Sequence, residues 1–242
     1  PRQFEASSRV MSRPGIQHLT LTPEAALDLA HATGIRSSFV IYNCNSLPEA
    51  YLDPVAPIDP PVVLNVASVQ PRKGPDLFID VAAEVCGEHP SVKFVWVGGH
   101  PTEALTMRIK DYGLENRVEF VGRVMPPYQW IQRASVVFFS SRSEAFGLAV
   151  AEAMACYRTV CCFQGTGAEF VVGDTGIVVP RFNTSLAAQR IVEELNRPSP
   201  ARINVGARHR YDALFSPRSF AQRLSMILQE PQYDEALFVA PL

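Results

Sequence analysis

Between residues 62 and 179, short apolar runs alternate with longer segments in which apolar residues recur every three or four positions. Runs this short predict strands that are buried on both faces, and the wider spacing predicts amphipathic helices. The predicted strands are 62–66, 92–97, 118–121, 136–139, 160–163 and 176–179. The predicted helices between them are 75–88, 102–112, 127–133, 146–156 and 168–172.

This regular alternation predicts an α/β fold, a doubly wound parallel sheet with right-handed crossovers. Ligands of such sheets bind beyond the carboxyl ends of the strands, where the connecting loops gather. These loops carry Lys73, Gly98, Gly122, Glu144 and Gly165. We therefore expect the functional side chains of this domain to lie along that one edge.

Two flanking regions complete the pattern. Before the alternation, Thr22 is placed to cap a helix over 23–33 that Gly34 ends, and strands are predicted over 18–22 and 39–42. This β-α-β piece is too small to have a core of its own. After the alternation, three further helices are predicted over 186–195, 201–214 and 217–228.

The domain boundary is predicted from proline content, because prolines 48, 54, 57, 60 and 61 fall in one short stretch. We expect a small amino-terminal unit with its linker over 1–58, a ligand-binding domain over 59–230 and a tail over 231–242. Because the chain begins with Pro1, we also expect a fragment or a processed piece of a longer protein.

The composition narrows the class of protein. A formal net charge of −2 gives no general attraction to nucleic acid, so we expect no nucleic-acid partner. No apolar run is long enough to cross a bilayer. The five cysteines lack the spacing of a metal site, which favours small buried side chains in a reducing compartment. We expect a cytoplasmic protein, either free or peripheral at a membrane.

The first candidate for chemistry is the pair Arg72-Lys73, which follows the first strand of the alternation. Two cations on a loop at the ligand-binding edge suit a diphosphate. The alternative is a solvated basic pair ahead of a helix, which needs no ligand.

The second candidate is the stretch from Glu144 to Glu152, at the entry to an alanine-rich helix. The backbone amides of Phe146, Gly147 and Leu148 and the helix dipole suit an anion. Because a phosphate would repel a carboxylate, we expect Glu144 to accept hydrogen bonds from sugar hydroxyls. Glu152 could hold both hydroxyls of a ribose. The alternatives are a helix-start acid for Glu144 and an ordinary solvated helix face for Glu152.

Two weaker candidates lie on other loops of the same edge. Gly165-Thr166 enters a helix through glycines and suits phosphate or sugar, or is only a tight turn. His100 follows Gly98 and Gly99, and a loop histidine without a nucleophile pattern is more typical of a solvated side chain. The chain has neither a Walker P-loop nor G-x-G-x-x-G after a strand, which argues against common nucleotide hydrolases and dehydrogenases.

The stretch SRSEAFGLAVAEAMA, in which seven residues separate Glu144 from Glu152, resembles the E-x7-E signature of retaining glycosyltransferases with the GT-B fold, family 4 above all. The resemblance covers about residues 61–228, the carboxy-terminal, donor-binding domain of that family. Further matching segments, in order, are VLNVASVQPRKGPDLFIDVAAEV, VKFVWVGGHP, NRVEFVGRV, ASVVFFSS and GDTGIVVP.

The resemblance implies roles for the candidates. Lys73, with Arg72 near it, would contact the donor diphosphate, and Glu144 would hold donor sugar hydroxyls, so that Lys73 and Glu144 carry the catalysis. Glu152 would bind the ribose, and the loop from Gly122 to Val124 would lie against the base. The other expected substrate-binding residues are Gly98, Phe146, Gly147, Leu148, Gly165 and Thr166. Neither a metal nor a cofactor is expected.

The sequence departs from the family pattern at three places. Ala67-Ser68 replaces the usual Gly-Arg, Tyr157 replaces a glycine after the E-x7-E helix, and Thr159 replaces a proline. Residues 1–58 resemble only the last part of the acceptor domain. We therefore expect the catalyst to need the missing amino-terminal domain or a partner chain.

The resemblance leaves the acceptor open as a glycan, a lipid or a small molecule, with a nucleotide sugar as the donor. The first interpretation is a retaining transferase that acts by front-face displacement. A catalytically silent nucleotide-sugar module is the alternative, and half of a sugar-nucleotide epimerase is a third interpretation that the E-x7-E spacing opposes.

Overall fold

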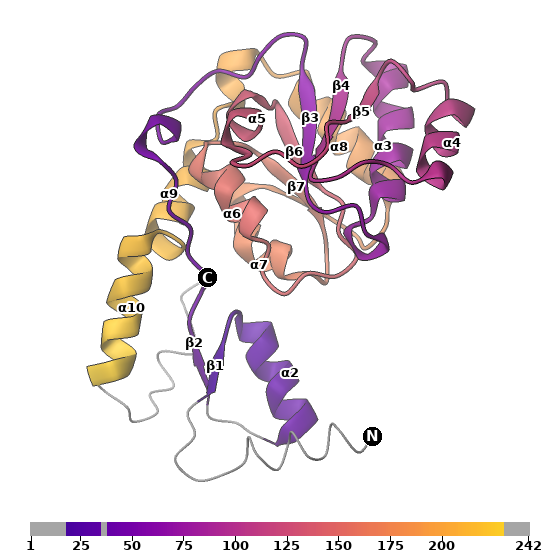
Figure 1. The fold of residues 1–242 in the computed structure, drawn as a ribbon. Coiled ribbons are helices and arrows are strands. Elements are labelled where there is room, and N and C mark those ends of the chain that lie inside the picture. The colour runs from indigo at the N-terminus through magenta and orange to yellow at the C-terminus, as the bar shows by residue number, and fades with distance from the viewer. Residues whose placement is uncertain (1–17, 35–37, 230–242) are drawn as a thin grey trace.

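The fold, described for residues 18–34 and 38–229 of a computed structural model, is built on a six-stranded parallel sheet (Figure 1). Its strand order is β5-β4-β3-β6-β7-β8, so the chain builds outward from β3 in one direction and then from β6 in the other. This confirms the predicted doubly wound α/β fold. The strands are β3 (Val62–Val66), β4 (Lys93–Val97), β5 (Val118–Phe120), β6 (Val136–Phe139), β7 (Val160–Phe163) and β8 (Ile177–Val179).

Helices cover both faces of this sheet, and each face has its own buried apolar cluster. One cluster lies beneath α3 (Pro75–Glu88), α4 (Glu103–Asp111) and α8 (Thr184–Leu195). The other lies beneath α5 (Tyr128–Arg133), α6 (Leu148–Ala155), α7 (Gly167–Val172) and α9 (Val205–Leu214). Burial on both faces explains why the strands are continuous apolar runs.

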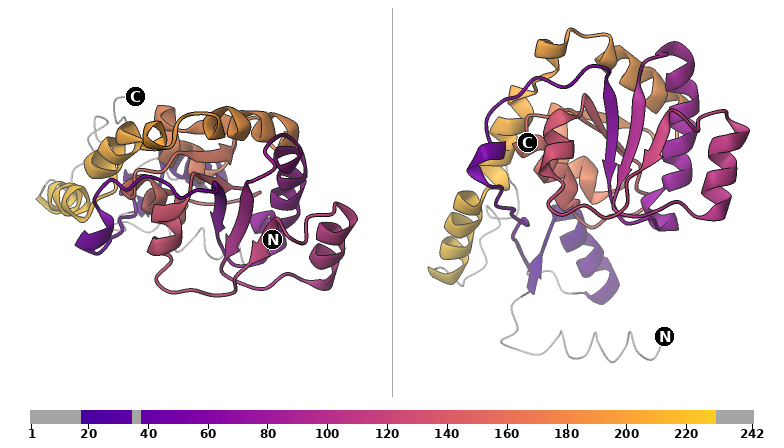
Figure 2. Two further views of the ribbon diagram at one scale, coloured as in Figure 1. Left: turned by 90° about the horizontal axis from the view of Figure 1, so that it is seen from above. Right: turned by 45° about the horizontal axis from the view of Figure 1, so that its top comes forward.

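The small amino-terminal unit consists of β1 (His18–Thr20), α2 (Pro23–Thr33) and β2 (Ser38–Val40), with the two strands parallel. Together with α10 (Pro217–Gln229), it lies to one side of the six-stranded sheet (Figure 2). Phe39 and Ile41 form a separate buried cluster with Ile227 of α10. The unit therefore takes part of its core from the far end of the chain. The expectations for 1–17 and 230–242 lie outside the described residues.

Several predicted boundaries are confirmed by the local chemistry that set them. Thr22 caps α2 by accepting from the Ala25 amide at 3.1 Å, and Gly34 ends that helix with a left-handed φ of 76°. Ser216 caps α10 by accepting from the Ser219 amide at 3.2 Å. The predicted strands 62–66, 136–139 and 160–163 and the helix 75–88 have the observed bounds.

Three predicted helix starts are wrong by two residues or more. Helix α8 begins at Thr184 and not at 186, because the Asn183 side chain accepts from the Leu186 amide and starts the helix there. Helix α6 begins at Leu148 and not at 146, because Gly147 has a left-handed φ of 94° and the Phe146 side chain turns into the core. Helix α9 begins at Val205 and not at 201, because the Asn204 side chain accepts from the Ala207 amide and starts the helix there.

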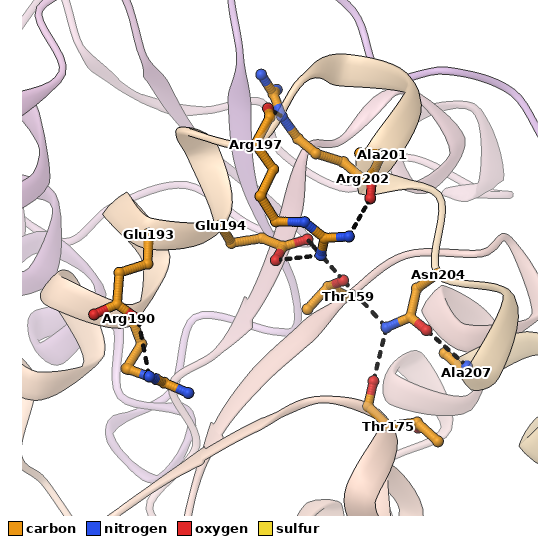
Figure 3. A network of polar contacts seen from close by, with 10 residues as sticks. All are labelled: Thr159, Thr175, Arg190, Glu193, Glu194, Arg197, Ala201, Arg202, Asn204 and Ala207. Carbon is orange, nitrogen blue, oxygen red and sulfur yellow. Dashed lines mark hydrogen bonds and ion pairs between the residues drawn. The ribbon is translucent and has the colours of Figure 1, made fainter.

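The amino ends of β7 and β8 are closed by a buried polar network (Figure 3). The Glu194 carboxylate accepts from the Thr159 hydroxyl at 3.0 Å and from Arg197 at 2.8 Å. The Asn204 amide donates to the Thr159 hydroxyl and, at 2.7 Å, to the Thr175 carbonyl. Because its side chains satisfy one another, this edge has a structural role, which leaves the opposite, carboxyl edge for ligands.

Two further features concern the chain as a whole. Within 18–34 and 38–229, no helix combines the length and apolar character that a membrane span requires. Over the same residues, no three His, Cys, Asp or Glu side chains gather as metal ligands would. Cys156, Cys161 and Cys162 are buried, as predicted.

Candidate functional site

The candidate site lies where the strand order reverses, between the carboxyl ends of β3 and β6. After β3, residues 71–73 form a 3-10 turn, and Gly74 leads into α3 with a left-handed φ of 65°. A side chain at Gly74 would bring its Cβ within 2.1 Å of the Ser140 carbonyl oxygen. The loops after β3 and β6 therefore touch backbone to backbone, at the place where such sheets bind ligands.

Lys73 and Glu144 form an ion pair across these two loops, through Lys73 Nζ and Glu144 Oε2. The two side chains are only 11% and 17% exposed, and the ammonium lies 5.6 Å from the centre of the Phe139 ring. Two residues that the sequence predicts for separate roles thus meet directly. In this arrangement each charge balances the other.

A cavity of about 290 Å³ lies beside this pair. The first amides of α6 border it without a side-chain cap, because the N-cap residue is Gly147. Phe146 is 2% exposed and packs edge-on against Phe215, so its main chain is what remains for a ligand. An uncapped helix start beside a lysine suits an anion. The cavity is lined by Leu21, Asn43, Val66, Lys73, Phe139 and residues 144–149.

A second cavity, of about 800 Å³, shares Glu144 and Ala145 with the first and extends to the small amino-terminal unit. Gly165 and Thr166 line it, so the structure brings them close to Glu144. Two of their polar groups already form hydrogen bonds within the protein. The Gly165 amide donates to Glu169 at 2.8 Å, and the Thr166 hydroxyl donates to the Phe163 carbonyl at 3.1 Å.

Glu152 lies in α6 and lines neither cavity. Its half-buried carboxylate accepts from the Asn45 amide, which comes from the linker segment. Burial raises the pKa of Glu152 to about 6, and the Asn45 hydrogen bond opposes that rise in part. The Asn45 main chain is fixed in turn, because its carbonyl accepts from the Tyr211 hydroxyl. The Glu152 carboxylate, which is predicted to bind ribose, is therefore already hydrogen-bonded to the side-chain amide of Asn45.

Gly98 and Val124 also lie away from the two cavities. The Gly98 amide donates to the Gly122 carbonyl at 2.7 Å. Gly98 has a φ of 132°, and a Cβ there would lie 2.2 Å from the Ala67 carbonyl oxygen, so the backbone at this position requires glycine without any ligand. Val124 is half-buried against the core.

The two arginines of the site differ in how far they are engaged. Arg72 is exposed, and its Nε donates to Gln70 at 3.1 Å. Arg142, which the sequence reasoning did not single out, binds Asp76 through two hydrogen bonds of 2.7 and 2.5 Å. That contact lowers the pKa of Asp76. The available signal was its position two residues before Glu144.

The sequence reasoning also missed three residues that contact the candidate residues directly or through one another. Asn45 bonds to Glu152, and Asn65 bonds to Ser140, whose hydroxyl in turn donates to the Lys73 carbonyl oxygen. Asn65 had a visible signal, since it is the polar residue within the otherwise apolar strand VVLNV. Asn45 had none, because its role depends on a contact with Glu152, far away in the sequence.

Comparison with known proteins gives a family match that lies over the sheet domain. Residues 60–197 match the family described as Glycosyl transferases group 1. A D-inositol 3-phosphate glycosyltransferase from Acidothermus cellulolyticus is 36% identical over 138 residues, which cover 51% of this chain and 31% of that protein. An alpha-D-kanosaminyltransferase from Streptomyces kanamyceticus is 30% identical over 145 residues, covering 58% and 38%. The matched segments thus span about a third of the length of these relatives.

The fold has close counterparts among solved structures. HepE from Anabaena, in complex with UDP and glucose, superposes with a TM-score of 0.80 at 20% identity. The match covers 94% of this chain and 67% of that one. It confirms the expected Rossmann-like architecture of a GT-B glycosyltransferase.

Proposed function

The chain belongs to the glycosyl transferases group 1 family, and we propose that it supplies the donor-binding half of an enzyme that transfers a sugar from a nucleotide diphosphate sugar to an acceptor. The observation that carries this proposal is the Lys73–Glu144 pair beside the uncapped start of α6. A cation, a carboxylate and free helix amides at the reversal point of the sheet offer what a diphosphate and a sugar require.

In the proposed complex, Lys73 turns from Glu144 to the diphosphate, and the carboxylate is released to accept hydrogen bonds from sugar hydroxyls. The amides of Phe146, Gly147 and Leu148 bind phosphate or sugar oxygens. Positive charge aimed at the departing diphosphate stabilises the transition state more than the ground state. Lys73 and the helix start provide this charge, so the proposal needs no metal ion.

The nucleoside is proposed to lie toward Glu152, which takes both ribose hydroxyls once the Asn45 amide has left it. The loop from Gly122 to Val124 would lie against the base. Arg72, Gly98, Gly165 and Thr166 complete the proposed donor-binding set.

Retention is proposed to follow from a front-face displacement. The bond between the anomeric carbon and the diphosphate oxygen breaks while the acceptor oxygen bonds to the same face of that carbon. The acceptor proton passes to the leaving diphosphate, so no protein nucleophile is needed. The acceptor, whether a glycan, a lipid or a small molecule, would be held mainly by a further domain or a partner chain, because the matched segments cover only 31% and 38% of the relatives.

Calorimetric titration of this chain with UDP, GDP and their sugars, with and without EDTA, tests the proposal. Lys73→Met should weaken binding of the preferred nucleotide by about tenfold, because a charge-assisted contact is lost. The exposed lysine of α4 provides the control, and Lys110→Met should change the affinity by less than about twofold. Absence of nucleotide binding at millimolar concentration refutes the proposal.

A catalytically silent nucleotide-sugar module is the second candidate. Two observations favour it: Ala67-Ser68 stands where the family pattern has Gly-Arg, and the charges of Lys73 and Glu144 balance each other. Donor binding without transfer or hydrolysis, even after the missing domain is supplied in trans, would support this candidate over the enzyme.

A further inference from the structure

Asn65 is a polar residue in the middle of the sheet. It is the fourth residue of β3, between Leu64 and Val66, and its side chain has no exposed surface. Its Oδ1 atom has no hydrogen-bond partner among the described residues. A buried polar atom without a hydrogen-bond partner lowers the stability of the folded state. An apolar side chain at this position would stabilise the core more, so the amide must have a purpose other than stability.

The other end of this amide reaches the candidate site. Asn65 Nδ2 donates to the hydroxyl of Ser140 at 2.9 Å, and that hydroxyl donates to the Lys73 carbonyl oxygen at 3.0 Å. The direction of the chain is fixed, because an amide nitrogen can only donate and a carbonyl oxygen can only accept. Two hydrogen bonds therefore connect the central strand to the main chain of Lys73.

Ser140 also restricts Gly74, the residue that follows Lys73. Its carbonyl oxygen is so close to Gly74 that no side chain fits there. Ser140 is fully buried and directly follows β6, so it moves with the rigid part of the sheet. The turn that carries Lys73 thus meets both the hydroxyl and the main chain of Ser140. Arg142 also contacts this turn, because its amide donates to the Arg72 carbonyl oxygen at 2.7 Å and its Nη1 donates to the Pro71 carbonyl oxygen at 2.9 Å.

We propose that Asn65 and Ser140 are positioning residues that hold the Lys73 turn at the ligand-binding edge of the sheet. This rests on the proposed function, in which Lys73 binds the donor diphosphate. Neither residue touches the ligand. They fix the main chain that carries the Lys73 side chain, whose ammonium group reaches the ligand. A small displacement of such a binding group weakens its interaction strongly.

The strand β6 offers a matched control for this proposal. Ser135, which directly precedes β6, is also fully buried. Its hydroxyl accepts from the Val62 amide at 3.3 Å and from Arg202 at 3.1 Å. Ser135→Ala therefore removes a buried hydroxyl at the other end of β6, at the edge of the sheet opposite to Lys73.

The first measurement is hydrogen exchange of the segment 67–78, read by mass spectrometry on the whole chain. Ser140→Ala should speed exchange of the Lys73 and Gly74 amides, which bond within the turn to Gln70 and Pro71. Ser135→Ala should leave it unchanged, and Ser140→Thr, which keeps a hydroxyl, should restore protection. Equal exchange in the wild type and Ser140→Ala overturns the proposal.

The second measurement is the affinity for UDP, compared with the free energy of unfolding in urea. Ser140→Ala should weaken UDP binding about tenfold, and Ser135→Ala less than about twofold, although both lower stability. In the double variant Asn65→Val with Ser140→Ala, both polar partners are gone. Its stability should recover, while its affinity should stay low.

The outcomes separate the two proposals. Wild-type UDP affinity in Ser140→Ala, or equal losses in Ser140→Ala and Ser135→Ala, overturns the positioning role. If the wild type binds neither UDP nor GDP nor their sugars, or binds the preferred nucleotide as well after Lys73→Met, the proposed function fails. Hydrogen exchange then still decides whether Ser140 holds the turn.

Discussion

Replacing Glu152 with glutamine makes the cost of burying this carboxylate measurable. Burial raises its pKa from 4.5 to about 6, against the opposing Asn45 hydrogen bond. A rise of this size is worth about 2 kcal/mol. The folded protein binds this proton more tightly than the unfolded chain does, so protonation of Glu152 contributes to the free energy of unfolding. That contribution is fully present below about pH 4.5 and is lost as the pH rises through about 6. Glutamine keeps the shape and does not titrate.

The expected result is a difference that depends on pH. Relative to the wild type, the free energy of unfolding of Glu152→Gln should rise by about 2 kcal/mol between pH 4 and pH 7. Urea unfolding at four values of pH measures it, and Glu115→Gln, an exposed loop substitution, controls for the loss of one negative charge. Parallel stability curves for the wild type and Glu152→Gln would refute the reasoning, because the carboxylate would then bear no burial cost.

Three further predictions concern packing and reactivity. Gly74→Ala should lower the free energy of unfolding in urea by about 3 kcal/mol or more, because its Cβ would overlap a carbonyl oxygen. Gly34→Ala, at a similar φ with nothing within 4 Å, should cost only about 1 kcal/mol, and equal losses would contradict this view. Arg158 is fully buried and donates to three carbonyl oxygens. Arg158→Met should therefore lower the free energy of unfolding by about 3 kcal/mol or more. An unchanged urea midpoint would exclude a stabilising role for these hydrogen bonds. Iodoacetamide should modify the native chain at the half-buried Cys44 and Cys86 before the buried Cys156, Cys161 and Cys162, because the reagent reaches a partly exposed thiol first. Burial raises the pKa of Cys86 as well as those of the three buried thiols, so the order rests on exposure, and equal labelling rates by mass spectrometry would contradict it.

The sequence was sufficient where a local rule governs the structure. The bounds of α3 follow from Pro75 at its start and from apolar residues at helical spacing. Thr22 and Gly34 delimit α2 through a cap and a left-handed residue. The start of α6 was mispredicted because alanine-rich composition favours a helix at 146, whereas the left-handed Gly147 and the burial of Phe146 delay it.

The candidate site was predictable only in outline. The rule that ligands bind at the carboxyl edge of parallel strands selected loops that the structure brings together, and by itself it places Lys73 and Glu144 in one neighbourhood. The rule does not say which charges pair. Nor does it indicate that Asn45 donates a hydrogen bond to Glu152, or that the backbone conformation at position 98 requires glycine.

The sequence by itself determined the alternation of strands and helices, the caps and the residue types at the ligand-binding edge, because these depend on neighbours along the chain. Only the tertiary structure decided the partners of the polar groups. The ion pair of Lys73 with Glu144 spans 71 residues, and the hydrogen bond from Asn65 to Ser140 spans 75. Such contacts exist because β3 and β6 are neighbours in the sheet, and that adjacency is a property of how the whole chain packs.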